Sequence, residues 1–308
     1  MTADAALPAR TDGPTRGIDH IVQVVSDLEE AAARYRALGF TTTPPARHPF
    51  GTGNILVQFA NRSFLELLTV VDPAAIEEPG PGRFSFAAFN RDALAAHGEG
   101  GAMVVVRSRD ASADRAAFAS AGLPVFEPFG FERTATGPDG IARKVAFSLT
   151  FTADPAAPDV GIFACQSHYP ENFWKPDFQR HDNGAHGIAG IVISTPRPDA
   201  SAAVWAAVTG AVPRPVAGGL SFDTPDGDVT LLTPASIEAR WGISVPAEQS
   251  VRPHIIAMRI AMPEFHHTSA GIWFEKIEHG NAGAARIVPP GRAHGLMLII
   301  ETMGSRVL

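Results

Sequence analysis

Cysteine is almost absent from this sequence, and other features that mark particular protein classes are missing too. The one cysteine among 308 residues is Cys165, so no disulfide can form within the chain. That composition is typical of a reducing compartment, and we expect a cytoplasmic protein. No apolar run approaches the roughly 20 residues that a membrane helix needs. The first residues also lack the hydrophobic core of a signal peptide; they read MTADAALPARTDGPTR.

Positive charge is scarce as well. The chain has 25 Lys and Arg against 32 Asp and Glu, a formal net charge of −7. Because nucleic acids and anionic membranes select basic surfaces, we expect neither as a partner. The sequence also lacks GxGxxG, GxxxxGK[ST] and GxSxG, so no nucleotide-binding loop or serine nucleophile is indicated.

Apolar residues, by contrast, are plentiful. Hydrophobic residues make up 45% of the chain and charged residues 19%, which is enough for an ordinary globular interior. A chain of this length predicts two domains or one large one.

One pattern of elements recurs along the chain. Residues 18–25 are rich in β-branched side chains and predict a strand, after which Ser26 and Glu29 form a capping box that opens a helix. Gly39 ends that helix, and the runs NILVQFA and SFLELLTVV predict two further strands. The same order returns twice, with matching helix lengths over Asp27–Gly39, Asp110–Gly122 and Asp199–Gly210.

These repeats predict an α+β fold of paired βαβββ modules in two half-barrel domains. One module has a single apolar sheet face that it cannot cover alone, so modules are expected to pair. We expect a flexible tail at 1–16, modules one and two at 17–176, and modules three and four at 177–308. A fourth module is predicted from HIIAMRIAM to GLMLIIETM, although its middle keeps the spacing poorly.

The opening stretch resembles the first module of the vicinal oxygen chelate superfamily; it reads GIDHIVQVVSDLEEAAARYRALGF. More narrowly, two stretches resemble a glyoxalase-like family: HPFGTGNILVQFANRSFLELLTVVDP and CQSHYPENFWKPDFQRHDNGAHGIAGIVI. The resemblance covers about residues 17–195. It implies glyoxalase/dihydroxybiphenyl dioxygenase-like half-barrels around a divalent metal, although a shared fold alone does not fix the reaction.

The resemblance implies that His20 and Glu66 are metal ligands from neighbouring strands. Imidazole and carboxylate together suit Zn, Fe, Mn, Ni or Co. A packed, hydrogen-bonded core histidine is the alternative for His20. An unpaired carboxylate in the apolar run around Glu66 is costly, however, and a cation would offset that cost.

The third ligand is expected from module two. Met103 stands at the position equivalent to His20 and is a poor ligand for a hard ion, whereas His168 would complete a triad of two histidines and one carboxylate. If His168 lies beyond its strand, it would orient the substrate instead. His48 and Asn54 are the candidate catalytic pair beside the module-one strands, with His48 as general base and Glu66 as its alternative.

The second half is expected to be a scaffold. Gly190 or Ala189, and Ile256, stand where His20 would be, so a divalent ion would lack convergent ligands there. His254 and Glu301 could form a second His/Glu pair, but Ile256 rather than His254 matches His20. His254 and the histidines of the Phe265–His267 run are interpreted as solvated or packing residues. Glu171, Trp174, His181 and Asn183 are expected to fix the two halves together.

The sequence therefore predicts a metal-dependent lyase or isomerase, or a ring-cleaving dioxygenase, acting on a small substrate that chelates the metal through adjacent oxygens. Having only two tyrosines, Tyr35 and Tyr169, makes dioxygenase chemistry the weaker option. A metal-free binding or sequestration protein is the alternative. The expected partner is a small molecule, and a homodimer is left open.

Overall fold

The chain repeats one structural unit, a strand, a helix and three strands. The computed structural model describes residues 15–137, 140–262, 275–277 and 285–302. Unit one consists of β1 (Ile18–Val24), α1 (Leu28–Ala37), β2 (Ala46–Arg47), β3 (Thr52–Gln58) and β4 (Phe64–Val70). Unit two consists of β5 (Gly100–Arg107), α3 (Ala111–Ser120), β6 (Phe129–Thr136), β7 (Ala142–Thr152) and β8 (Gly161–Ser167).

The second half continues the repeat. Unit three consists of β9 (Gly187–Ser194), η2 (Pro198–Ser201), α5 (Ala202–Thr209), β10 (Pro213–Val216), β11 (Gly219–Thr224) and β12 (Gly227–Leu232). Unit four contains β13 (His254–Met262), β14 (Glu275–Ile277), β15 (Ala285–Val288) and β16 (Met297–Thr302). The remaining elements are η1 (Pro73–Ala75), α2 (Phe86–His97), α4 (Pro170–Phe173), α6 (Pro234–Trp241), α7 (Ala247–Ser250) and η3 (Pro290–Arg292). The run Phe265–His267, expected to be solvated or packing, lies outside the described residues.

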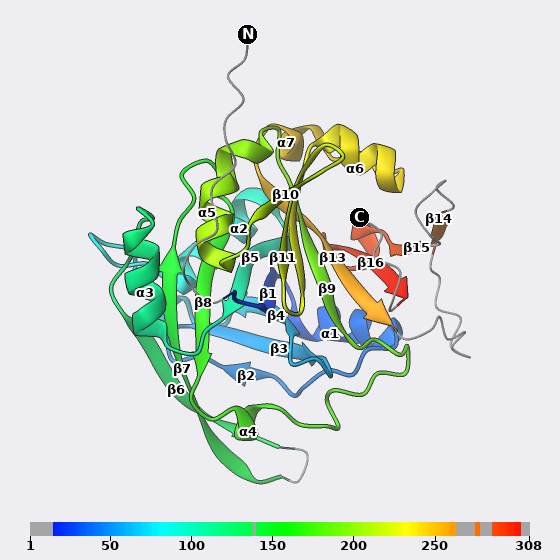
Figure 1. Cartoon of the computed structure of the whole chain (residues 1–308). Helices are drawn as coiled ribbons and strands as arrows, with labels where there is room; N and C mark the ends of the chain where they lie inside the picture. The colour runs from blue at the N-terminus through cyan, green and yellow to red at the C-terminus, as the bar shows by residue number, and fades with distance from the viewer. Residues whose placement is uncertain (1–14, 138–139, 263–274, 278–284, 303–308) are drawn as a thin grey trace.

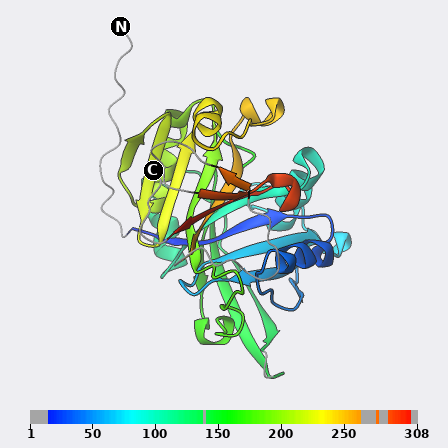
Figure 2. The same ribbon diagram turned by 90° about the vertical axis from the view of Figure 1, so that its right-hand side faces the viewer.

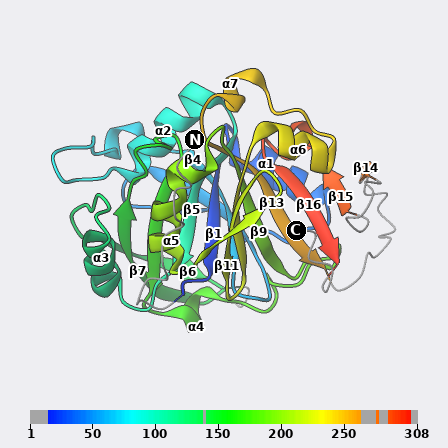
Figure 3. The ribbon, with the colours of Figure 1, turned by 45° about the horizontal axis from the view of Figure 1, so that its top comes forward.

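The units pair through their first strands. Strand β1 runs antiparallel to β5, and β9 runs antiparallel to β13, while each first strand lies parallel to the last strand of its own unit. This arrangement confirms the predicted α+β fold of paired βαβββ modules (Figures 1 and 3). The two pairs meet where Ile255 of β13 lies opposite Gly101 of β5. The boundary expected between residues 176 and 177 stays a prediction.

Strand alternation gives each sheet two different faces. In β4, Leu65 and Leu67 join the core cluster that contains the α1 residues Ala31, Ala32 and Tyr35. Phe64 and Leu68 belong instead to a second cluster on the opposite face. Figure 2 shows α1 packed against the strands of unit one. The face that α1 leaves uncovered therefore forms the concave wall of the first half.

The helix start differs by one residue from the predicted capping box. Asp27, not Ser26, is the N-cap of α1, and its Oδ1 accepts hydrogen bonds from the backbone N–H groups of Glu29 and Glu30 at 2.9 Å each. A carboxylate also interacts favourably with the helix dipole, so Asp27 serves better than a hydroxyl here. The helix ends as predicted, with Gly39 at φ 83°.

The concave face of the second half is filled by its own residues. Ile237 and Trp241 of α6 pack in one cluster with Val192, Met297 and Ile299. The residues predicted as core of this half are buried, which confirms that part of the prediction: Ile191, Ile193, Leu231, Ile260 and Leu298. This half therefore keeps the strand framework with its interior occupied.

The segments around the first half are anchored to it. Arg16 is buried, pairs with Asp114 at 2.6 Å and donates its backbone N–H to the Thr209 carbonyl, so the folded part begins before Gly17. His181 accepts a hydrogen bond from the backbone N–H of Thr41 at 2.9 Å, and Asn183 donates to the Leu38 carbonyl at 2.8 Å. These bonds support the predicted structural role of the linker. None of the helices in the described part of the chain is long and apolar enough to span a membrane.

Candidate metal and substrate site

Two neighbouring parallel strands bring His20 and Glu66 to the same face. His20 on β1 lies opposite Phe64 on β4, and Glu66 follows two residues later on the same side of the strand. The His20 Nε2 and Glu66 Oε2 atoms are 3.6 Å apart, and both side chains are almost completely buried. His20 and Glu66, which were expected to act together, therefore lie side by side in the structure.

His20 is fixed by contacts on its far side. Its Nδ1 lies 2.7 Å from Asp19 Oδ2, and its ring stacks on Phe64 with centroids 4.1 Å apart. A carboxylate on Nδ1 selects the tautomer that carries the proton there, which leaves the Nε2 lone pair directed toward Glu66. This is the arrangement that metal-binding histidines commonly show.

His48 and Asn54 complete the polar cluster. Asn54 Nδ2 donates to Glu66 Oε1 at 2.6 Å and lies 3.3 Å from His48 Nε2. His48 Nε2 is itself 3.9 Å from Glu66 Oε1, while its Nδ1 contacts Thr52 Oγ1 at 2.8 Å. The Glu66 carboxylate therefore lies between two imidazoles, one on each of its oxygens.

An apolar cavity surrounds this cluster. It encloses about 40 Å³, room for about three water molecules. Its wall contains seven phenylalanines: Phe50, Phe64, Phe86, Phe131, Phe147, Phe163 and Phe173. Arg133 and Cys165 are the other polar side chains that line it. The cluster is therefore desolvated and strengthened electrostatically by its surroundings.

Burial sets the protonation of the two central groups. It raises the pKa of Glu66, an effect that the neighbouring His20 and Asn54 oppose. Burial, together with the charge of Arg133 and with His20, lowers the pKa of His48 to about 3. At neutral pH His48 is therefore an uncharged imidazole with a lone pair available, and a poor proton acceptor.

The His48 shift predicts an acid-dependent loss of stability. Because the folded-state pKa lies below the ordinary 6.5, His48 stabilises the fold above pH 6.5, and this contribution is lost as pH falls from 6.5 toward about 3. In metal-free protein, moving from about pH 7.5 to about pH 5 should remove about 2 kcal/mol through this group. Urea unfolding at both pH values, compared with His48→Gln, measures the difference. An identical pH dependence in the two proteins would contradict it.

Comparison with known proteins identifies the family of the chain. A family model described as a glyoxalase-like domain matches residues 18–209, more than half of the chain. The chain belongs to the glyoxalase-like domain family. This family assignment confirms the predicted membership of the vicinal oxygen chelate superfamily. A search of curated proteins finds no match.

Solved structures share the fold of this glyoxalase-like protein at low sequence identity. A hypothetical protein from Staphylococcus aureus is 12% identical with a TM-score of 0.64, over 92% of this chain and 98% of its own. A mutant of 4-hydroxymandelate synthase from Streptomyces coelicolor is 11% identical with a TM-score of 0.60, over 94% and 93%. A xylose isomerase-like TIM barrel/4-hydroxyphenylpyruvate dioxygenase fusion protein is 13% identical with a TM-score of 0.54, over 96% and 50%. These likenesses concern the fold alone.

His168 is not brought into the cavity of this glyoxalase-like protein. Its Nε2 contacts Ser148 Oγ at 2.8 Å, and Ser148 faces away from the cavity because its neighbours Phe147 and Leu149 line it. On β8 the lining residues are Phe163 and Cys165, and the strand ends at Ser167. His168 lies with Lys144 and Tyr169 in an adjacent open groove, which shares Phe131 and Phe147 with the cavity wall. The expected third ligand therefore has to come from elsewhere.

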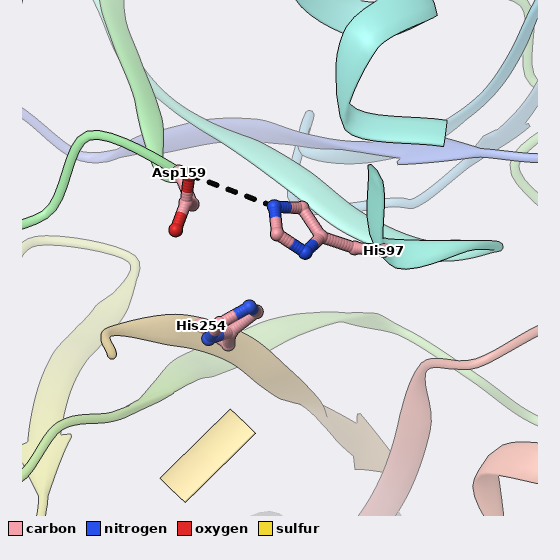
Figure 4. Close-up of side chains that lie close together, drawn as sticks. All are labelled: His97, Asp159 and His254. Carbon is pink, nitrogen blue, oxygen red and sulfur yellow. Dashed lines mark ion pairs between the residues drawn. The ribbon is translucent and has the colours of Figure 1, made fainter. Parts of the chain in front are cut away.

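A second group of potential ligands lies at the junction of the two halves. His97 at the end of α2, Asp159 before β8 and His254 at the start of β13 have donor atoms within 4.8 Å of one another (Figure 4). His97 Nε2 is 3.5 Å from Asp159 Oδ1. Arg252 lies 3.8 Å from the other oxygen of Asp159, so a cation already neutralises part of this more exposed site. The His97, Asp159 and His254 group is therefore the second possible metal site, against which metal binding by the buried cluster can be tested.

Sequence reasoning missed Arg133 and the phenylalanine wall. Phe129, Phe131 and Arg133 alternate along β6, and the last two line the cavity. That period of two was a readable signal that these side chains share one face. This alternation matches no known motif, however. Which face of the strand becomes concave also depends on how units one and two pair.

Proposed function

We propose that the protein is a metal-dependent enzyme of the lyase or isomerase class, acting on a small substrate that binds the metal through adjacent oxygens. The observation that carries this proposal is the buried Glu66 carboxylate between His20 and His48. Its raised pKa means that burial outweighs its present partners, and a cation would reverse that balance.

The donor types present suit a divalent ion, although the three donor atoms do not all lie within 4.8 Å of one another, as those of His97, Asp159 and His254 do, so the side chains of His20 and His48 would close on the ion. His20 Nε2, His48 Nε2 and the Glu66 carboxylate would hold it, with His48 taking the place expected for His168. Asn54 Oδ1 is buried and has no hydrogen-bond partner among the described residues, so it is a fourth available oxygen. Two imidazoles and a carboxylate suit Zn, Fe, Mn, Ni or Co.

A bound divalent ion would supply Lewis acidity that polarises the substrate oxygens. The chain itself would move the proton. In metal-free protein Glu66 is the stronger base of the two candidates, because its pKa is raised whereas the pKa of His48 is lowered to about 3. In the metal-loaded protein Glu66 would act as base only if the ion holds it loosely, because a nearby cation lowers its pKa. Asp19 holds the His20 ring in place, and the phenylalanine wall excludes water from the reacting groups.

Proton transfer is favoured over ring cleavage by the composition of the cavity. No tyrosine stands among its lining residues. The Tyr35 hydroxyl donates to Gln23 Oε1 in the outer core, and Tyr169 lines the adjacent groove with His168. Among the described residues, the cavity therefore lacks a tyrosine that could give acid–base help to oxygen chemistry.

Titration of chelator-treated protein with cobalt(II) tests the proposal. We expect one equivalent to bind with the visible absorption of a nitrogen- and oxygen-ligated ion, because the three donors come from a prepared cavity. Elemental analysis of the purified protein then identifies the natural metal. Absence of binding under these conditions would contradict the proposal.

A metal-free binding protein is the second candidate. The phenylalanine-lined cavity supports it, because an apolar ligand needs no metal there. Retention of an apolar ligand by protein that binds no cobalt would favour this candidate. Cytoplasmic location and homodimer formation stay predictions.

A further inference from the structure

Arg133 is a partly buried cation that forms no ion pair among the described residues. Its Nε is fully enclosed and has no hydrogen-bond partner among the described residues. Glu66 influences it only at longer range, beyond the 4 Å limit of an ion pair. An enclosed guanidinium hydrogen that meets no acceptor is costly in a folded protein, so an acceptor supplied by a ligand would remove that cost.

The groove outside the cavity has the opposite charge to the whole molecule. This groove, of about 520 Å³, is lined by the cations Arg47, Arg133 and Lys175, and no aspartate or glutamate is among its lining residues in the described part of the chain. The chain as a whole carries a formal charge of −7. Lys175 Nζ donates to the Glu171 carbonyl at 3.0 Å rather than to a carboxylate. A concave surface with one sign of charge attracts small ions of the other sign.

The groove and the cavity lie next to each other at Arg133. Arg133, Asn54, Leu56 and Phe173 line both spaces. A molecule in the groove therefore lies against residues that also line the cavity with the Glu66 cluster. Asn54, whose Oδ1 is also unpartnered in the described part of the chain, lies at the same junction.

We propose that the ligand of this site is a small anion, and that Arg133 binds its carboxylate or phosphate group while the apolar body lies in the larger groove against Leu56 and Phe173. The planar fork of a guanidinium matches both oxyanions. The assignment rests on the proposed function for its substrate, since it names the chemical class that the Glu66 site would act on. The contacts of Arg133 on which the assignment depends do not involve a metal.

Calorimetric titration with four probes tests the assignment. Phenylacetate and benzyl phosphate supply the two oxyanions on one apolar body, phenylacetamide is the neutral counterpart of phenylacetate, and inorganic phosphate lacks the apolar body. Wild type should prefer phenylacetate over phenylacetamide by about tenfold or more, because charge-assisted bonds are the stronger ones. Arg133→Gln should abolish that preference, and Arg133→Lys should keep part of it. Arg47→Gln, on the exposed rim, should change it less than threefold or so.

The same titration in His20→Ala separates this assignment from the metal proposal. If Arg133 binds the anion, the preference persists in His20→Ala and is lost in Arg133→Gln. A preference lost in His20→Ala but kept in Arg133→Gln would assign the anion to the metal and overturn the role of Arg133. Equal binding of phenylacetate and phenylacetamide by wild type, or no binding of either oxyanion at millimolar concentration, would also overturn it. Circular dichroism verifies folding, and Arg133→Lys keeps the test decisive if Arg133→Gln does not fold.

Discussion

His20→Ala and Glu66→Gln are each expected to lower bound divalent metal at least about tenfold. Loss of a residue that merely supports a ligand already costs about 10- to 100-fold in metal affinity, and loss of a ligand removes more. Both side chains lie on strands whose packing does not depend on them, so far-ultraviolet circular dichroism should stay near wild type. Elemental analysis after equilibration with one equivalent of metal measures the effect.

The matched control is the double variant His97→Ala/His254→Ala. It removes two histidines from the junction cluster and leaves the cavity untouched. We expect it to keep its metal. If it loses metal while His20→Ala and Glu66→Gln retain theirs, the ion belongs to the junction and the proposed site is wrong.

Glu66→Gln carries a second readout that does not involve metal. The folded-state pKa of Glu66 is raised, so its contribution to stability is present in the protonated form at low pH and is lost as pH rises through that pKa. In chelator-treated protein at neutral pH, burying this carboxyl group therefore costs stability, and glutamine, which does not ionise, relieves that cost. Urea unfolding should show Glu66→Gln to be more stable than wild type under chelation and less stable in the presence of metal.

Arg259→Met is expected to lower the free energy of unfolding by about 3–5 kcal/mol. Arg259 is buried and donates to both oxygens of Asp228 at 2.7 Å and to both oxygens of Glu301 at 2.7 and 2.9 Å. Removing the guanidinium leaves two carboxylates buried together without their cation. Equilibrium unfolding in urea measures the loss.

The triple variant Arg259→Met/Asp228→Asn/Glu301→Gln is the control for that prediction. It removes the cation and both charges, so most of the loss should be recovered. If the triple variant is no more stable than Arg259→Met, lost packing rather than the unpaired charges causes the effect.

The repeat could be predicted from the sequence because its signals are local. Strand composition, helix caps and the stops at Gly39, Gly122 and Gly210 each depend on a few neighbouring residues, and all three glycines have positive φ. The pairing of His20 with Glu66 came from a resemblance to known proteins. The structure places those two residues together in one buried cluster.

The remaining site residues depend on register and on the pairing of units. His168 was expected beside the metal because it follows β8 closely, but alternation places Cys165 inside and the bond to Ser148 draws His168 to the other side. Ile256 was aligned with His20 by counting from the strand end. The parallel pairing instead matches Arg259 with Ile299 and Ala261 with Glu301, as β1 and β4 match His20 with Phe64 and Val22 with Glu66. Counting along a strand cannot reveal such an offset.

That register gives the two halves the same framework with different sources of positive charge. Arg259 and Glu301 occupy in unit four the places that His20 and Glu66 occupy in unit one. The second half thus carries a cation that is covalently part of the chain and present from synthesis onward. On our proposal the first half takes its cation, a divalent metal ion, from solution. The charge of the Glu66 carboxylate is therefore balanced only when the metal is bound. Removing the metal would then lower the stability of the first half alone, while the second half, whose cation is Arg259, would keep its stability.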